Sequence, residues 1–247
     1  MFSLEIECDQ ARHDWLLAEL FDFAPLGVVE LDGRLRVFFE DSADRAQLLA
    51  CYPSALLRQE EDRDWVGHAR AMLQPIPVGS RFFLVPEWRD DPAPEGRFRI
   101  AVNPGMAFGT GIHPTTQLCL EALEEFVKPG AVVLDVGTGQ GILARAAQLL
   151  GAAKVVACDI DPVAIEIAGM GFVGSVDAVR SASVDLAAAN ISPEAIVKLA
   201  PDLLRVRRPH GTILASGFEL PEIDQVRLAL PSVREVRWKG TWALAVA

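Results

Sequence analysis

The chain has 247 residues, of which 51% are hydrophobic and 23% are charged, the usage of an ordinary globular protein. Its formal net charge of -11 argues against a broad surface for nucleic acid, because lysine and arginine build such surfaces. No apolar run is long enough to span a membrane, and the N-terminal segment lacks the basic start and apolar stretch of a secretion signal. We therefore expect a cytoplasmic monomer with no nucleic-acid or membrane partner.

The cysteines stand singly along the chain, at Cys8, Cys51, Cys119 and Cys158. None belongs to a Cys-x-x-Cys pair or has a histidine at ligand spacing, so the sequence predicts neither a disulfide framework nor a metal site. We interpret all of them as small buried hydrophobic residues.

Residues 1–60 are predicted to form a small α+β unit. The alternating run FSLEIE indicates a strand, and an amphipathic stretch follows it over residues 9–23. Asp32 and Gly33 join two further alternating runs, which indicates a hairpin because both turn positions favour positive φ. A short helix from Ser42 to Ala50 and a closing strand in ALLRQEE complete the order β-α-β-β-α-β, which is typical of a ferredoxin-like module.

Residues 61–79 are predicted to be a linker helix that is stopped by prolines. Residues 80–247 begin with two strand-like runs, RFFLVPEW and RFRIAVNPG, and then alternate helices with short valine-rich strands. Such alternation indicates a parallel sheet covered on both faces. Lys239 and Gly240 mark a terminal hairpin. The fold class predicted for this part is therefore a doubly wound α/β domain that ends in an antiparallel pair.

A glycine-rich turn follows the first predicted parallel strand, in VVLDVGTGQG. Gly137, Gly139 and Gly141 lie at the carboxyl end of that strand, where ligands of open α/β sheets bind. Ile142 stands one residue past the last of them, where a dinucleotide fingerprint has its third glycine. The turn alone leaves both NAD and S-adenosylmethionine open as cofactors.

The next strand ends in two acids, Asp159 and Asp161. An acid about 20 residues past the glycines is positioned to accept the hydroxyls of a ribose, which favours a nucleoside cofactor. Asp161 precedes Pro162 and is better suited to cap the following helix than to bind a ligand.

Three stretches resemble the ribosomal protein L11 methyltransferase (PrmA) family of class I S-adenosylmethionine-dependent enzymes: NPGMAFGTGIHPTTQLCLEAL, LDVGTGQGILARAAQLLGAAKVVACDIDPVAI and DLAAANI. The resemblance covers residues 60–247 and implies a Rossmann-like fold with S-adenosylmethionine as cofactor. It also implies methyl transfer to lysine ε-amines, and to the N-terminal α-amine, of a ribosomal protein that residues 1–60 recognise.

The same resemblance implies the site residues. Its cofactor contacts fall on Thr115, Gly137, Gly139, Asp159 and Asn190, together with Phe108, Gly109 and Thr110 of a glycine-rich loop that would close over the methionine part. Asn190 is also implied as the catalytic residue, because its side-chain oxygen would orient the attacking amine. The alternative for the loop is a plain connector in which His113 or Thr115 only caps the next helix.

The segment between Asp159 and Asn190 is shorter than in the family, so part of the adenine pocket is expected to be rebuilt or lost. Four other functions therefore stay open. They are an NAD-dependent oxidoreductase, a binding module that has lost the cofactor, a methyltransferase for a different protein, and a methyltransferase for ribosomal RNA or a small molecule.

Overall fold

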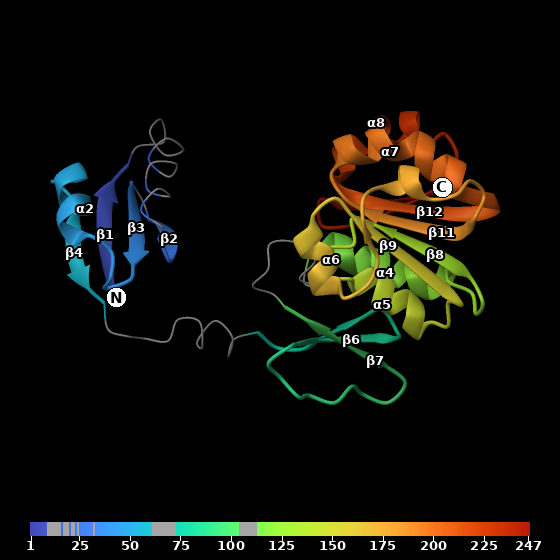
Figure 1. The fold of residues 1–247 in the computed structure, drawn as a ribbon, viewed down its shortest axis with the longest axis horizontal. Helices are drawn as coiled ribbons and strands as arrows, with labels where there is room; N and C mark the ends of the chain where they lie inside the picture. The colour runs from blue at the N-terminus through green and yellow to red at the C-terminus, as the bar shows by residue number, and fades with distance from the viewer. Residues whose placement is uncertain are drawn as a thin grey trace. The chain divides into compact units, whose positions relative to one another are not determined.

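The computed structural model describes residues 1–8, 16, 20, 23, 25–31, 33–60, 73–103 and 113–247. The chain divides into two compact units, residues 1–72 and 73–247 (Figure 1). Several predictions fall outside the described residues: most of the helix over 9–23, the hairpin residue Asp32, residues 61–72 of the predicted linker helix 61–79, and the loop that contains Phe108, Gly109 and Thr110. These stay predictions. For the remaining linker residues, 73–79, the helix prediction is wrong: residues 76–78 form a strand, and the prolines at 75 and 77 disfavour a helix.

The first unit holds a four-stranded antiparallel sheet in the order β2-β3-β1-β4. Its elements are β1 (Phe2–Glu7), β2 (Gly27–Leu31), β3 (Arg34–Phe39), α2 (Arg45–Cys51) and β4 (Leu56–Gln59). This arrangement agrees with the predicted ferredoxin-like module. Helix α2 begins later than the predicted Ser42, because the carboxylate of Asp44 caps it by accepting a hydrogen bond from the backbone N–H of Gln47 at 3.0 Å.

The two faces of this sheet differ in chemistry. Alternate residues of β1 and β3 form the core of the unit, with Phe2, Leu4 and Val37 fully buried. The opposite face holds Glu5, whose carboxylate accepts a hydrogen bond from Arg36 Nε at 2.9 Å. That hydrogen bond to Arg36 holds the pKa of Glu5 below its usual range.

The second unit is built on a seven-stranded sheet in the order β10-β9-β8-β11-β12-β14-β13. Neighbouring strands from β10 to β12 are parallel, whereas β14 and β13 are antiparallel to their neighbours. The strands are β8 (Val132–Val136), β9 (Lys154–Asp159), β10 (Phe172–Val173), β11 (Val184–Asn190), β12 (Arg207–Glu219), β13 (Glu235–Lys239) and β14 (Trp242–Val246). The predicted doubly wound domain with a terminal hairpin is confirmed.

Helices cover both faces of this sheet. They are α4 (Pro114–Phe126), α5 (Ile142–Leu149), α6 (Pro162–Ala168), α7 (Pro193–Val206) and α8 (Ile223–Ala229), with short 3₁₀ turns η1 (Val176–Ala178) and η2 (Leu220–Glu222). Side chains of α4 and α5 join the core on one face, and those of α7 and α8 join the core on the other. Alternate residues of β8 divide between the two cores, with Val133 on the first face and Leu134 on the second.

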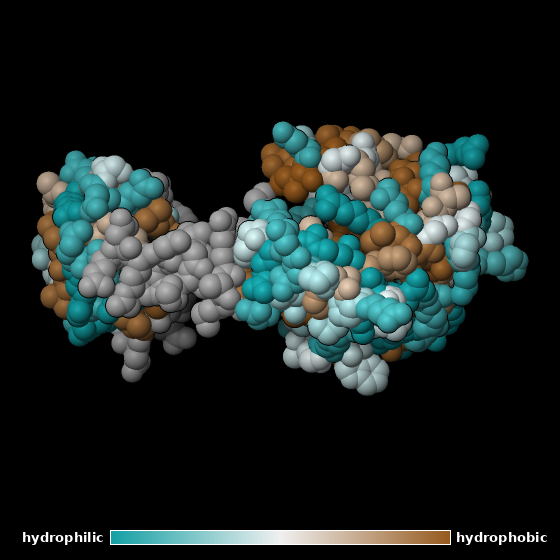
Figure 2. Space-filling view, turned by 90° about the horizontal axis from the view of Figure 1, so that it is seen from below, coloured by the Kyte–Doolittle hydropathy of each residue, from teal (hydrophilic) through white to brown (hydrophobic). Residues whose placement is uncertain are grey.

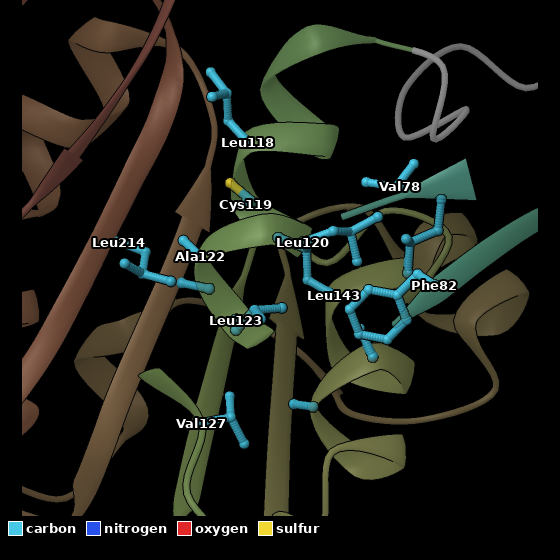
Figure 3. Close-up of a cluster of buried hydrophobic side chains, with 14 of the residues drawn as sticks. Val78, Phe82, Leu118, Cys119, Leu120, Ala122, Leu123, Val127, Leu143 and Leu214 are labelled. Carbon is cyan, nitrogen blue, oxygen red and sulfur yellow. The ribbon is translucent and has the colours of Figure 1, made fainter. Parts of the chain in front are cut away.

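A small third sheet, β5 (Ile76–Val78), β6 (Phe82–Pro86) and β7 (Phe98–Val102), packs against α4 on the side away from the large sheet. Figure 3 shows this arrangement: Val78 and Phe82 lie on one side of α4, and Leu214 of β12 lies on the other. Helix α4 is therefore held in the middle of a hydrophobic core. This packing also fixes the position of the N-terminal residues of α4.

Two surface residues differ from the sequence interpretation. Cys51, expected in the core, is exposed because it ends α2 on the solvent side, whereas Cys119 and Cys158 are buried. Trp238 is 64% exposed on the edge strand β13, although an aromatic residue beside alternating apolar residues is ordinarily buried by packing. Elsewhere the visible face of the second unit is mostly hydrophilic, with separate hydrophobic patches (Figure 2). No helix in the described part of the chain has the length and apolarity needed to cross a membrane.

Candidate functional site

Three neighbouring strands of the large sheet end at the same level. Val136 of β8 is paired with Cys158 of β9 on one side and with Ala189 of β11 on the other. The residues that follow are Gly137, Asp159 and Asn190, so the parallel register places them side by side at the carboxyl edge. The chain changes direction across the sheet between β8 and β11, and such switch points are where open α/β sheets bind ligands.

The turn after β8 uses glycine for space as well as for backbone conformation. Gly137 has a φ of 68°, and a Cβ built on it would lie 2.4 Å from Cγ2 of Ile191. The N–H groups of Gly137 and Thr138 both donate to the carbonyl of Cys158, at 2.9 and 3.1 Å. The turn is thus locked to β9 and passes directly beneath the residue that follows Asn190.

Asp159 connects the turn to the end of β9. One of its carboxylate oxygens accepts a hydrogen bond from Gly139 N at 3.0 Å, and the other accepts one from Asp161 N at 3.0 Å. The side chain is half-buried, and each carboxylate oxygen keeps a further lone pair for a ligand hydroxyl. Asp161 caps α6 by accepting from Val163 N at 2.9 Å, as predicted.

Ile160 is a candidate site residue that the sequence analysis did not name. It lies between the two acids and is 80% exposed. Most of its apolar surface is thus open to solvent at the edge where a ligand would bind. The available signal was an apolar residue placed directly after a buried strand and between two carboxylates, where a turn would ordinarily be polar.

Asp135 lies buried under the glycine turn, and it too was missed. Its Oδ2 accepts hydrogen bonds from Thr138 Oγ1 at 2.7 Å and from Ala144 N at 3.0 Å, which ties the turn to the start of α5. Its Oδ1 has no partner among the described residues. Burial raises the pKa of Asp135 to about 6. The signal was an acid within the apolar strand VVLDV.

Gln140 links the same turn to the small sheet. Its buried carboxamide binds both backbone groups of Asn103, accepting from N at 3.0 Å and donating to O at 2.8 Å. Asn103 in turn donates from Nδ2 to Glu87 at 2.6 Å. A cavity of about 270 Å³ adjoins this pair and is lined by Glu87, Ala101, Asn103, Gln140, Arg145 and Ile167.

His113 caps helix α4. Its Nδ1 accepts from Thr115 N at 3.4 Å and lies 2.8 Å from Thr115 Oγ1, while its ring meets Trp242 edge-on at 4.5 Å. His113 thus caps α4, whereas the choice between a connector and a cofactor loop for the residues before it stays a prediction. Thr115 is 4% exposed and bound to His113, and its contact with a cofactor stays a prediction.

Asn190, the residue predicted to be catalytic, contacts the same helix. Its Nδ2 donates a hydrogen bond to Oγ1 of Thr116 at 3.3 Å. Thr116 is 3% exposed, whereas Asn190 is half-buried at the sheet edge. The described residues contain no cluster of histidine, cysteine and acidic side chains arranged for a metal ion. The site therefore offers amide, carboxylate and backbone groups.

The family model for ribosomal protein L11 methyltransferase (PrmA) matches residues 40–239. The chain belongs to the PrmA family. The match covers the small sheet and the parallel part of the large sheet, and so includes every described residue of the candidate site. The second unit accordingly has the Rossmann-like fold of the class I S-adenosylmethionine-dependent methyltransferases, the class of the PrmA family.

Individual PrmA relatives agree with this assignment. The ribosomal protein L11 methyltransferase of Symbiobacterium thermophilum is 45% identical over 180 residues, which are 69% of this chain and 59% of that protein. The corresponding protein of Heliobacterium modesticaldum is 37% identical over 88% of this chain and 74% of its own length. A crystal structure of ribosomal protein L11 methylase from Lactobacillus delbrueckii subsp. bulgaricus has a TM-score of 0.60 and 30% identity, covering 71% of this chain and 97% of that one.

The extent of the matches differs between relatives. The matched part of the chain spans 59% of the Symbiobacterium protein and 62% of a Burkholderia cenocepacia protein of the same name. The family and the fold follow from these comparisons.

Proposed function

We propose that this protein binds S-adenosylmethionine at the carboxyl edge of its large sheet and transfers the methyl group to lysine ε-amines of ribosomal protein L11, with the N-terminal α-amine as a further acceptor. The observation that supports this best is the level alignment of Gly137, Asp159 and Asn190 on three neighbouring strands. Membership of the PrmA family supports the same reaction.

The residues present fit an adenosine cofactor. The Asp159 carboxylate has unused lone pairs on both oxygens, one for each ribose hydroxyl, and Gly139 N holds it in place. Ile160 offers the exposed apolar surface that a purine ring requires. At Gly137 no side chain separates the backbone of the turn from a ligand. We assign the ribose to Asp159, the adenine to Ile160, and the methionine part to the glycine turn and Thr115.

The cofactor supplies an electrophilic methyl group on a sulfonium when it is bound. The chain then has to align a neutral amine with that methyl and exclude water, which are tasks of positioning. Asn190 performs the alignment. Its Oδ1 accepts a hydrogen bond from an N–H of the amine, which turns the nitrogen lone pair toward the methyl group. Burial of the lysine lowers the pKa of its amine and favours the neutral form.

Residues 1–60, within the first unit, are proposed to recognise the ribosomal protein, and the second unit is proposed to carry out the transfer. A reaction on a different protein is the main alternative, because relatives such as the Symbiobacterium and Burkholderia proteins extend beyond the matched part. Replacement of L11 by other ribosomal proteins in the same assay separates the two, since only L11 is expected to accept methyl groups.

The test compares two variants in two measurements. Asn190→Ala is expected to lose most methyl transfer to L11 while it retains S-adenosylmethionine affinity in calorimetry better than Asp159→Ala does. Asp159→Ala is expected to lose affinity, because its carboxylate both contacts the ribose and holds Gly139 N. If both variants lost cofactor affinity equally, the assignment of Asn190 to the amine would be wrong. If neither did, the cofactor would bind elsewhere.

A further inference from the structure

We propose that Thr116 is a positioning residue that orients the carboxamide of Asn190, holding its nitrogen so that its oxygen is presented to the acceptor amine. The inference rests on the proposed methyl transfer. Its structural basis is the hydrogen bond from Asn190 Nδ2 to Thr116 Oγ1 at 3.3 Å, which joins α4 to the end of β11.

Thr116 is held in place by its surroundings, whereas the Asn190 side chain is less restrained. Thr116 N donates to the carbonyl of His113 at 3.1 Å in the first turn of α4, and the side chain is only 3% exposed. Further along, Leu120 and Leu123 anchor α4 in the core (Figure 3). Asn190 is half-buried at a sheet edge, and the bond to Thr116 is its one side-chain hydrogen bond to the described residues.

The orientation of the carboxamide matters because its two ends have opposite chemistry. The NH₂ group only donates and the oxygen only accepts. An attacking amine carries hydrogens that need an acceptor, so the oxygen has to face it, whereas an NH₂ group there would donate to the nitrogen lone pair and occupy it. With Nδ2 bound to Thr116, Oδ1 has no partner among the described residues and remains available for that task.

The size of the effect follows from the arrangements that the bond excludes. A free asparagine side chain has three staggered χ1 wells and a broad, roughly two-fold χ2, which give about six arrangements. If one of them is productive, loss of the anchor is expected to lower kcat about sixfold. The KM for S-adenosylmethionine is expected to stay within about twofold, because Thr116 does not hold the ribose or the glycine turn.

The experiment uses the full-length protein and the variants Thr116→Val and Thr116→Ser. Valine keeps the shape and removes the acceptor, and serine keeps the hydroxyl. Thr212→Val is the matched control, because Thr212 is another largely buried threonine and lies away from the site. Its hydroxyl accepts a hydrogen bond from Arg234 at 3.1 Å. We expect Thr116→Val to lose about sixfold in kcat, while Thr116→Ser and Thr212→Val stay within about twofold of wild type.

A double-mutant cycle tests whether Thr116 acts through Asn190. In an Asn190→Ala background, Thr116→Val should cause no further loss, because there is no carboxamide left to orient. The same loss in both backgrounds would show that Thr116 acts through the fold or another group and would overturn the proposal. Unchanged kcat in the single variant would overturn it as well.

A measurement on the cofactor-free protein keeps this proposal separable from the proposed function. The side-chain NH₂ protons of Asn190 can be followed by NMR, and their exchange with water is expected to be slowed in wild type and Thr116→Ser. Thr116→Val should remove that protection. Protection without any methyl transfer would contradict the function and leave the anchoring intact, whereas absence of protection in wild type would contradict the anchoring itself.

Discussion

Replacing Gly137 by alanine would place a methyl group where the turn has no room for one. The added Cβ would lie 2.4 Å from Cγ2 of Ile191. Ile191 is itself confined: its N–H donates to Ser216 O at 3.0 Å, and its carbonyl lies against Gly217, where a Cβ would be 2.1 Å away. The β-branched side chain also has few χ1 alternatives. The turn, rather than Ile191, is therefore expected to move.

The free-energy cost of Gly137→Ala has two parts, and the same substitution at a second glycine separates them. At a φ of 68°, alanine pays about 1–2 kcal/mol for the left-handed conformation. Overpacking against Ile191 adds about 1–3 kcal/mol. Gly240, in the β13–β14 turn of the same unit, has a φ of 61° and nothing within 4 Å of an added Cβ. Gly240→Ala therefore carries only the first part.

Urea unfolding and calorimetry with S-adenosylmethionine measure the two consequences. We expect Gly137→Ala to lower the free energy of unfolding by about 1–3 kcal/mol more than Gly240→Ala, which is the overpacking part. We also expect at least a tenfold loss of cofactor affinity for Gly137→Ala alone, because displacement of the turn moves Gly139 N away from Asp159. Equal stability and equal affinity in the two variants would refute the close-approach argument.

Three other predictions concern the same turn. Asp159→Asn should weaken S-adenosylmethionine binding at least tenfold in calorimetry, whereas Asp161→Asn, which keeps a good helix cap, should leave it unchanged. Asp135 has its pKa raised from 3.8 to about 6, so the folded state binds the extra proton and the contribution of this carboxyl to stability falls as pH rises through that window. The free energy of unfolding of wild type relative to Asp135→Asn should thus drop by about 2 kcal/mol between pH 4 and pH 7 in urea titrations, and a flat difference would contradict the burial argument. Gln140→Ala removes both bonds to the backbone of Asn103 and should speed amide exchange at Asn103, while Asn103→Ala keeps those bonds and should preserve the protection of that amide.

The strand ends of the site were predictable because they depend on local patterns. Short valine-rich strands alternating with helices predict a parallel sheet, and parallel strands place their carboxyl ends at one edge. The glycine turn and the acid of the next strand follow from that rule, and the structure places Gly137 and Asp159 together accordingly. The capping role of Asp161 was predictable for the same reason, since a cap depends on its immediate neighbours.

Other features were missed because their signals are weak or their partners are distant. Helix α7 was overlooked, although Ser192 and Pro193 begin it, since Pro201 within it argues against a helix. Strand β10 has only the residues Phe172–Val173. The pairing of Gln140 with Asn103 joins residues that no local pattern connects.

Asn190 has both a feature that was predictable and one that was not. Its place at the end of a strand was predictable from the run DLAAANI. Its contact with Thr116 was not, because that contact depends on how α4 packs across the sheet. The orientation of this proposed catalytic side chain is thus a property of tertiary packing, even though its position along the chain is evident.

The reaction proposed for this protein is methyl transfer from S-adenosylmethionine to ribosomal protein L11. Intact-mass spectrometry of purified L11 after incubation with this protein and the cofactor measures that transfer, with the Asp159→Ala variant as the matched control. We expect L11 to gain whole methyl groups on lysine and α-amino nitrogens with the wild-type protein, and none with the variant. L11 that stays unmodified, while the wild-type protein binds S-adenosylmethionine, would contradict it.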